Sequence, residues 1–271
     1  MSGSLYLCPT PIGNLEDITL RVLRVLKEVD IIAAEDTRQT LKLLNHYDIK
    51  KAVVSYHEHN KASSGEKLLI DLKAGKNVAL VTDAGTPGIS DPGEDLVKLC
   101  LKEKINVISL PGATAITTAL VGSGLDTKKF VFLGFLPIKK SERESTLDEV
   151  RKERRTAIIY EAPHRIIGTL NELRSYIGDR RVVIARELTK VHEEYIRGTV
   201  DEVLSKLGDD VKGEIVVLIE GGKDEVVMEP EELLRRYIEC GMDKKEAIKL
   251  TAKQLKIPKR EIYKLALKEE M

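Results

Sequence analysis

The sequence predicts two α/β domains followed by a small helical module, and three observations lead to this prediction. In residues 1–122, short apolar runs alternate with helical patterns, which is typical of a parallel sheet with helices on both faces. A similar alternation resumes at residue 123, after a small-residue break, and continues to about residue 225. Residues 229–271 are helical and charged, without strand patterns. A chain of 271 residues is long enough for two such cores.

The composition is that of a globular protein with a well-solvated surface, since 42% of the residues are hydrophobic and 32% are charged. The formal net charge is zero, so the overall charge gives no indication of a nucleic-acid partner. A local excess of positive charge can still indicate one. Cys8, Cys100 and Cys240 lack metal-ligand or disulfide spacing, which predicts idle thiols in a reducing compartment. Without a long apolar stretch or a basic signal region, a cytoplasmic protein with no membrane partner is expected.

Five strands are expected in the first domain, and each is followed by a loop of unusual composition. The strands are residues 5–8, 31–34, 53–56, 78–81 and 107–110. Asp17 is expected to cap the first helix, and the later helices to span residues 39–46, 66–73 and 94–102, with a small-residue helix ending near residue 121. Because all the loops follow strands, they gather at one edge of the sheet, where open α/β sheets bind ligands.

The most informative loop is Thr82–Gly93, which holds three glycines and two prolines in twelve residues. Glycine allows positive φ and proline fixes φ, so this composition favours a loop of defined shape. Gly85 and Gly88 would let a flat ligand lie against bare backbone. The loop has neither the G-x-G-x-x-G nor the G-K-[ST] pattern, so a ligand site other than a Rossmann or P-loop site is expected.

The second domain is expected to contain strands at residues 130–135, 156–160, 181–185 and 214–219, with helices near residues 142–152, after residue 165 and at residues 200–207. Three helices are expected in the module, at residues 231–239, 243–255 and 258–267. From Lys244 to Lys268 the chain has nine Lys and Arg residues against two acidic ones. A positive module of this size resembles a helix-turn-helix, but a solvated helical tail explains the charge equally well.

Five motifs occur together and in order. They are T-P-I-G-N-L at 10–15, A-E-D-T-R at 34–38, the glycine loop at 82–93, L-P-G-A-T at 110–114 and E-A-P-H-R at 161–165. In these motifs the chain resembles the bacterial ribosomal RNA small-subunit methyltransferase I family of tetrapyrrole methylase-like (class III) methyltransferases. The resemblance covers nearly the whole chain. It implies S-adenosylmethionine in the cleft between two α/β domains, usually a homodimer, and ribose 2′-O-methylation of a decoding-centre cytidine in the 16S rRNA of the small ribosomal subunit.

The resemblance also implies which residues line the cofactor site. From the first domain they are Pro11, Asp83, Gly85, Thr86, Ile89, Ser90, Ala113 and Thr114, and from the second Tyr160, Glu161, Ala162, Leu188, Glu214 and Ile215. Ala113 and Thr114 precede a helix whose free N–H groups suit a carboxylate or ribose, although helix capping explains Thr114 equally well. Methyl transfer from a sulfonium needs alignment and a dry cleft, and no metal ion.

A ribose hydroxyl is a weak nucleophile until a base or strong acceptor takes its proton. Glu35 and Asp36 follow the second strand and are the candidates for this role, with Arg38 holding a phosphate or orienting a carboxylate. One of the two acids is expected to cap the following helix instead.

Roles outside catalysis are expected for three other polar residues. His57 and His59 are interpreted as surface residues rather than metal ligands, because no third ligand is evident. Arg165, at the start of a helix, is expected to contact a phosphate or a carboxylate.

Two other functions remain open. A methyltransferase acting on a corrin or porphyrin precursor would share the fold, but the basic module and the P-I-G-N motif favour rRNA. A non-enzymatic RNA-binding protein would not need the intact glycine loop.

Overall fold

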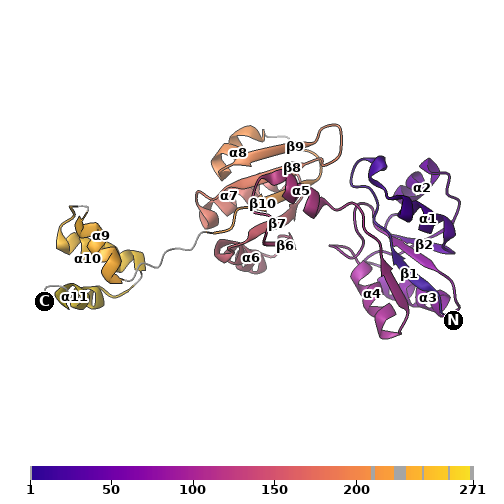
Figure 1. Ribbon diagram of the computed structural model, residues 1–271, viewed down its shortest axis with the longest axis horizontal. Helices are drawn as coiled ribbons and strands as arrows, with labels where there is room; N and C mark the ends of the chain where they lie inside the picture. Colours follow the sequence, from indigo (N-terminus) through magenta and orange to yellow (C-terminus); the bar gives the residue numbers. More distant parts are fainter. Residues whose placement is uncertain (1, 209–210, 223–229, 240, 256, 269–271) are drawn as a thin grey trace. The chain divides into compact units, whose positions relative to one another are not determined.

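The computed structural model describes residues 2–208, 211–222, 230–239, 241–255 and 257–268. The chain forms two compact units, Met1–Gly221 and Gly222–Met271 (Figure 1). The border predicted at residues 225–229 and the thiol of Cys240 lie outside the described residues.

The first unit begins with a five-stranded sheet in the order β3-β2-β4-β1-β5. Its strands are β1 (Ser4–Leu7), β2 (Ile31–Ala34), β3 (Ala52–Ser55), β4 (Val78–Val81) and β5 (Asn106–Ser109). All pairings are parallel, as predicted. Because β4 occupies the middle of the sheet, its carboxyl end delivers the glycine loop to the centre of the ligand-binding edge.

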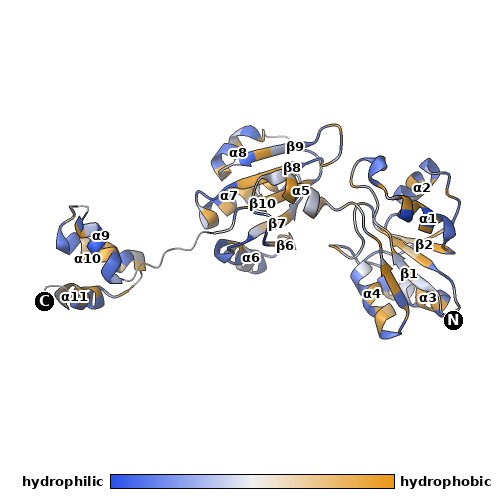
Figure 2. Ribbon diagram, in the orientation of Figure 1, coloured by the Kyte–Doolittle hydropathy of each residue, from blue (hydrophilic) through white to orange (hydrophobic). Residues whose placement is uncertain are grey.

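Helices cover both faces of this sheet. They are α1 (Leu20–Glu28), α2 (Thr37–His46), α3 (Lys61–Lys73) and α4 (Gly93–Lys102). Alternate strand residues point to opposite faces, so Leu5 and Leu80 pack with α3 and α4, whereas Ile32 and Val81 pack with α1 and α2. Figure 2 shows the hydrophobic residues concentrated on the strands and the inner helix faces. The thiol of Cys8 is buried in the second of these clusters, and burial raises its pKa to about 12, as expected of an idle cysteine.

The prediction that Asp17 caps the first helix is wrong. The Thr19 side chain accepts a hydrogen bond from the backbone N–H of Val22 and caps α1. Asp17 instead ends a short 3-10 turn, η1 (Leu15–Asp17), in which the backbone N–H of Glu16 donates to the side chain of Asn14. The extra turn shifts the helix start by two residues.

A second five-stranded sheet follows in the order β6-β7-β10-β8-β9. Its strands are β6 (Phe130–Phe135), β7 (Thr156–Glu161), β8 (Val182–Arg186), β9 (Glu194–Gly198) and β10 (Ile215–Ile219). Only the β6–β7 pairing is parallel among these. Strand β9 was not predicted, because its half-polar sequence on the sheet edge lacks the apolar run of the other strands.

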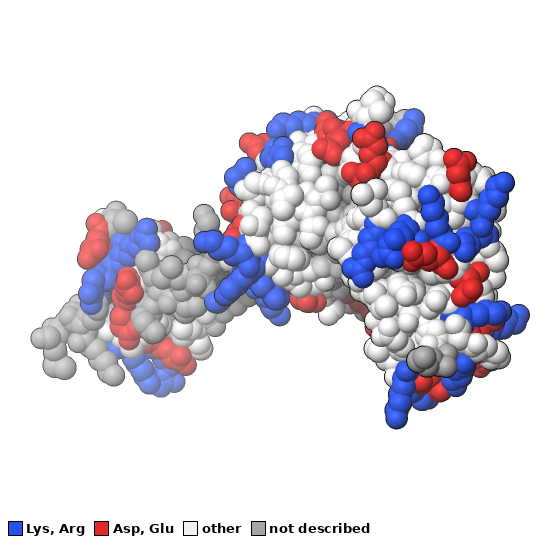
Figure 3. Space-filling view, turned by 45° about the vertical axis from the view of Figure 1, so that its right-hand side comes forward, with Lys and Arg blue, Asp and Glu red and all other residues white. Residues whose placement is uncertain are grey.

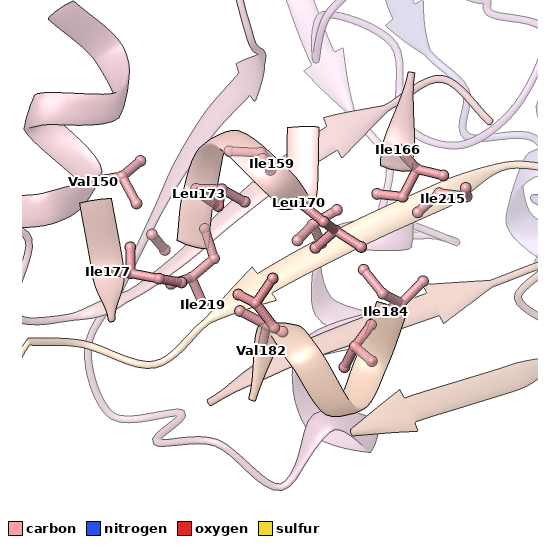
Figure 4. Close-up of a cluster of buried hydrophobic side chains, with 14 of the residues drawn as sticks. Val150, Ile159, Ile166, Leu170, Leu173, Ile177, Val182, Ile184, Ile215 and Ile219 are labelled. Atoms are coloured by element: carbon pink, nitrogen blue, oxygen red, sulfur yellow. The ribbon is translucent and has the colours of Figure 1, made fainter. Parts of the chain in front are cut away.

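Helices also cover both faces of the second sheet. They are α5 (Ala115–Ser123) on one face, and α6 (Lys140–Lys152), α7 (Ile166–Ile177) and α8 (Val200–Lys206) on the other. Figure 4 shows the hydrophobic core between this sheet and helices α6, α7 and α8, in which Ile159, Leu170 and Ile184 pack together.

All but the last residue of helix α5 lies before the boundary predicted at residue 122, yet its core contacts are with the second sheet. Ile116 and Leu120 of α5 pack with Ile158 and Leu218. Ile12, from the loop after β1, belongs to the same cluster. The first loop and α5 therefore join the two sheets into one unit, and the site described below lies where they meet.

The second unit is a three-helix module of α9 (Pro230–Glu239), α10 (Lys244–Leu255) and α11 (Lys259–Lys268), close to the predicted bounds. Its core contains Leu234, Ile248 and Ile262, one from each helix. Across the described ranges, no helix is both long enough and apolar enough to cross a membrane.

Substitutions of two leucines on α4 test whether this helix packs against the first sheet as described. Leu96 is fully buried and Leu101 is 60% exposed on the same helix. We expect Leu96→Ala to lower the free energy of unfolding by about 2–5 kcal/mol, because it leaves a cavity, and Leu101→Ala to change it by roughly 0.5 kcal/mol or less. Urea unfolding followed by circular dichroism measures both, and equal losses would contradict the assignment.

Candidate active site

A cavity of about 480 Å³ lies where the loops of the first sheet meet strands β7 and β10 of the second. This volume is within the usual range of small-molecule sites. Most of the predicted site residues line it: Glu35, Asp83, Gly85, Thr86, Ile89, Ser90, Thr114, Tyr160, Glu161, Ala162, Leu188, Glu214 and Ile215. Pro11, Asp36, Arg38 and Ala113 do not line it.

Sequence reasoning missed several lining residues as individual contacts: Ile12, Thr82, Ala84, Asp91, Ala115, Phe135, Pro163, Gly213 and Val216. Most are direct neighbours in sequence of residues that were predicted to line the site. Four of them, Ala115, Phe135, Gly213 and Val216, lie outside the five motifs, and among these only Phe135 is not next to a predicted residue. A signal for Phe135 was its place at the end of a strand, in a chain with only three phenylalanines.

The glycine loop is shaped by the carboxylate of Asp91. That carboxylate accepts hydrogen bonds from the backbone N–H groups of Gly88 (2.8 Å), Ile89 (3.2 Å) and Gly93 (2.8 Å). The backbone takes positive φ at Gly88 (+88°) and also at Ser90 (+63°), a conformation that costs a non-glycine residue energy. Asp91 therefore stabilises the strained conformation of the loop. Loop residues such as Gly85, Thr86 and Ile89 line the cavity.

Two neighbouring loops fasten the glycine loop from outside. Thr10 and Gly85 exchange backbone hydrogen bonds of 2.9 and 3.0 Å, and the Thr10 hydroxyl donates to the carbonyl of Thr82 at 3.1 Å. On the other side, the hydroxyl of Thr86 donates to the carbonyl of Ala113 at 3.0 Å. Three loops that are far apart in sequence thus form one hydrogen-bonded rim.

The loop after β8 brings the second sheet to this rim. Leu188 is buried between Glu187 and Thr189, whose φ angles are +52° and +65°. The Thr189 hydroxyl oxygen accepts a hydrogen bond from the backbone N–H of Asn14 at 3.0 Å. A Cβ atom at Gly13 would lie 2.6 Å from the carbonyl oxygen of Leu188, so only glycine permits this approach.

The two acidic candidates have different surroundings. Glu35 lines the cavity, and its Oε2 accepts a hydrogen bond of 2.8 Å from the hydroxyl of Thr82. Asp36 is the N-cap of α2, as expected for one of the two acids, and accepts from the backbone N–H of Arg38 at 2.8 Å. Its carboxylate also pairs with the guanidinium of Arg38 at 2.8 Å. This side-chain hydrogen bond is the main reason that the pKa of Asp36 is lowered to about 2.

Glu161 forms the buried centre of a polar network beside the cavity. Its side chain is inaccessible and accepts hydrogen bonds from the hydroxyl of Thr169 (2.6 Å) and the N–H of Ala162 (2.8 Å). Arg165 pairs with Glu161 at 3.2 Å and Arg143 lies 3.9 Å from it. Arg165 thus contacts a carboxylate, one of the two partners expected for it. A buried carboxylate needs such partners, because leaving it unpaired costs several kcal/mol.

Comparison with known proteins identifies the family to which this arrangement belongs. The model of the tetrapyrrole (corrin/porphyrin) methylases matches residues 4–204. The chain belongs to the tetrapyrrole methylase family. Its relatives in this family include ribosomal RNA small subunit methyltransferase I of Halalkalibacterium halodurans, which is 50% identical over 97% of this chain and 94% of that protein. The proteins of the same name from Bacillus subtilis and Synechocystis are 49% and 46% identical over 96% and 99% of this chain, and over 93% and 99% of their own lengths.

These findings confirm the family resemblance drawn from the motifs and make the chain an rRNA methyltransferase I-type enzyme. Solved structures of the tetrapyrrole methylase fold agree. Diphthine synthase has a TM-score of 0.64 at 13% identity over 80% of this chain and 90% of its own. Uroporphyrin III C-methyltransferase of Thermus thermophilus, solved in one case with S-adenyl homocysteine, has a TM-score of 0.57 at 19% identity over 80% and 97%. At these identities the likeness concerns the fold alone.

The role of Asp91 in shaping the glycine loop is testable by stability. We expect Asp91→Ala to lower the free energy of unfolding by about 1–3 kcal/mol, because three backbone N–H groups, two of them partly buried, lose their acceptor. Asp201→Ala is the control, since the ion pair of Asp201 with Arg174 is about 60% exposed on both sides and contributes about 1 kcal/mol or less. Urea unfolding of both variants provides the comparison, and an Asp91→Ala protein as stable as the control would contradict the role.

The Asp36–Arg38 pair predicts a pH dependence. Because the folded pKa of Asp36, about 2, lies below its ordinary value of 3.8, the pair stabilises the fold above about pH 4 and is lost as the pH falls towards 2. We expect a carboxyl ¹³C NMR titration to show this low midpoint in the wild type and a midpoint nearer 3.8 in Arg38→Ala. Lys42→Ala, which removes another cation of α2, is expected to leave the midpoint unchanged. A normal midpoint in the wild type would refute the pairing.

Proposed function

We propose that this enzyme transfers the methyl group of S-adenosylmethionine to the ribose 2′-oxygen of a decoding-centre cytidine in 16S rRNA. The observation that carries the proposal is the convergence of the glycine loop, the first loop and the Glu161 wall on one cavity, in a chain half identical to small-subunit rRNA methyltransferases. The 19% identity to a uroporphyrin methyltransferase gives no comparable support to a corrin or porphyrin substrate.

The residues of the cavity fit S-adenosylmethionine. Gly85 presents backbone without a side chain to the cavity, which Gly88 does not line, and Leu188 and Ile215 offer apolar surface suited to an adenine ring. Thr114 makes no side-chain cap on α5, so the first N–H groups of that helix remain available to a carboxylate. When bound, the cofactor supplies an electrophilic methyl group on a positively charged sulfur. The chain supplies alignment and a cavity that excludes water.

We propose Glu35 as the hydrogen-bond acceptor for the ribose hydroxyl, because it is the acidic residue of the A-E-D-T-R motif that lines the cavity. Thr82 fixes one of its carboxylate oxygens. Asp36 serves the α2 cap, and Arg38, whose side chain is 86% exposed, is proposed to contact a backbone phosphate. Ala113 supports the glycine loop through Thr86, and Pro11 adjoins Ile12 of the cavity wall.

The helical module is the proposed rRNA contact outside the cavity. Eight of the basic residues that the structure describes there are exposed: Arg235, Arg236, Lys245, Lys249, Lys253, Lys259, Arg260 and Lys264. Figure 3 shows Lys and Arg interspersed with Asp and Glu over the visible face of the first unit, so that face carries no field of one sign. Lys and Arg that neutralise phosphates supply most non-specific affinity for RNA.

The predicted cytoplasmic location and homodimer follow from the same function and remain proposals. Light scattering in solution tests the homodimer.

The direct test of the function is methyl transfer to isolated small ribosomal subunits that lack the modification. With labelled S-adenosylmethionine, we expect the label on a cytidine ribose 2′-oxygen, identified by nucleoside mass spectrometry. Label on a base, or transfer only to a corrin or porphyrin precursor, would refute the proposal.

The assignment of Glu35 is tested against its neighbour. We expect Glu35→Gln to lower kcat roughly a hundredfold or more, because the ribose hydroxyl loses its anionic acceptor. Asp36→Asn keeps an N-cap that is nearly as effective and is expected to stay close to wild-type turnover. Single-turnover rates, with S-adenosylmethionine affinity measured by calorimetry, separate chemistry from binding. The reverse order of the two variants would transfer the role to Asp36.

A further inference from the structure

Phe135, at the end of β6, is a half-exposed aromatic residue in the wall of the cavity. Its side chain is 53% exposed although it lines the cavity, and Ile89 of the glycine loop, also a lining residue, is 44% exposed. The two residues come from different sheets. An aromatic ring left open to solvent at the mouth of a binding cavity is typical of a contact site for a ligand rather than of a core position.

A β-bulge directs this ring. In a regular strand, residues three apart point to opposite faces, so Phe132 and Phe135 would diverge. The pairing of β6 with β7 shifts register between them, and Gly134 takes φ = +68° in the shifted segment. Both rings therefore pack edge-on against Tyr160, with centroid distances of 4.8 Å and 5.5 Å. A bulge that re-aims one side chain is a common device next to active sites.

The buried network around Glu161 fixes the backbone that follows the ring. Arg165 donates a hydrogen bond of 2.9 Å to the carbonyl of Leu136, and Arg143 donates one of 3.5 Å to the carbonyl of Pro137. Both arginines lie beside the inaccessible carboxylate of Glu161. Leu136 itself is buried. The ring is thus exposed on a rigid support, and a rigid aromatic surface loses little entropy when a ligand stacks on it.

We propose that Phe135 is a substrate-positioning residue that stacks on the base of an unpaired RNA nucleotide whose ribose enters the cavity. The inference rests on the proposed function, because it requires an RNA substrate. Proteins recognise unpaired RNA bases mainly by stacking on aromatic side chains. Stacking on Phe135 would hold the nucleotide by its base while leaving the ribose free to face Glu35.

Steady-state methylation of small ribosomal subunits by matched variants tests the proposal. We expect Phe135→Ala to raise KM for the subunits roughly 10- to 100-fold, because one base loses its stacking surface. The affinity for S-adenosylmethionine, measured by calorimetry, is expected to stay at the wild-type level. Phe135→Tyr restores the ring and is expected to restore KM, whereas Phe135→Leu is not. Phe130→Ala is the control, since Phe130 is 41% exposed at the opposite end of β6 and does not line the cavity.

Photo-cross-linking gives a readout that does not depend on methyl transfer. Subunits reconstituted with 5-iodocytidine at the target position are irradiated with the enzyme, and the cross-linked residue is identified by mass spectrometry. We expect Phe135 in the wild type and no cross-link at position 135 in Phe135→Ala. Gly134→Ala, which strains the bulge, is expected to weaken the cross-link and raise KM as well.

The outcomes separate the two proposals. If the wild type methylates subunits but Phe135→Ala behaves like Phe130→Ala, or loses cofactor affinity instead, the stacking role is overturned and the function stands. If the wild type methylates no subunit, the proposed function fails, and the cross-link alone decides whether Phe135 stacks on a base. A cross-link to another residue, or none, would overturn the inference.

Discussion

The site depends first on the hydrogen bonds between one carboxylate and the loop that contains it. Asp91 accepts from three backbone N–H groups of the loop after the central strand, and so holds closed a turn that includes a non-glycine residue at positive φ. A turn of this kind persists only when its surroundings over-determine it. The strained conformation has a functional consequence, because it places the backbone of this loop in the wall of the cavity.

The second constraint is that neither sheet completes the cavity alone. Ile12 of the first loop is buried in the core of the second sheet, and Gly13 allows that loop to touch the carbonyl of Leu188. Helix α5 follows a loop of the first sheet and packs on the second. Because the walls of the cavity come from both sheets, the contacts that join the sheets also set the width of the site. Substitutions in this seam are therefore expected to change ligand affinity without touching the ligand.

Much of the fold was readable from the sequence, because each strand of the first sheet is a short apolar run that ends in turn chemistry. The site edge followed from the same pattern, since parallel strands bring their carboxyl ends together. What the sequence did not reveal depends on tertiary structure. Thr19 replaced Asp17 as a cap because an unforeseen 3-10 turn intervened, and the edge strand β9 escaped because half of its residues are polar. Phe135 was missed because a period-two pattern points it away from Tyr160, and only the register shift at Gly134 returns it.

We propose that the backbone of the glycine loop and the wall formed by β7 and β10 together hold the methyl donor. A crystal structure of the protein with S-adenosyl homocysteine, the demethylated product, tests it most directly. We expect the ligand in the cavity between the sheets, against Gly85, with Asp91 still bonded to its three N–H groups. A ligand bound elsewhere on the chain, with this cavity filled only by solvent, would show that the glycine loop is not the cofactor site.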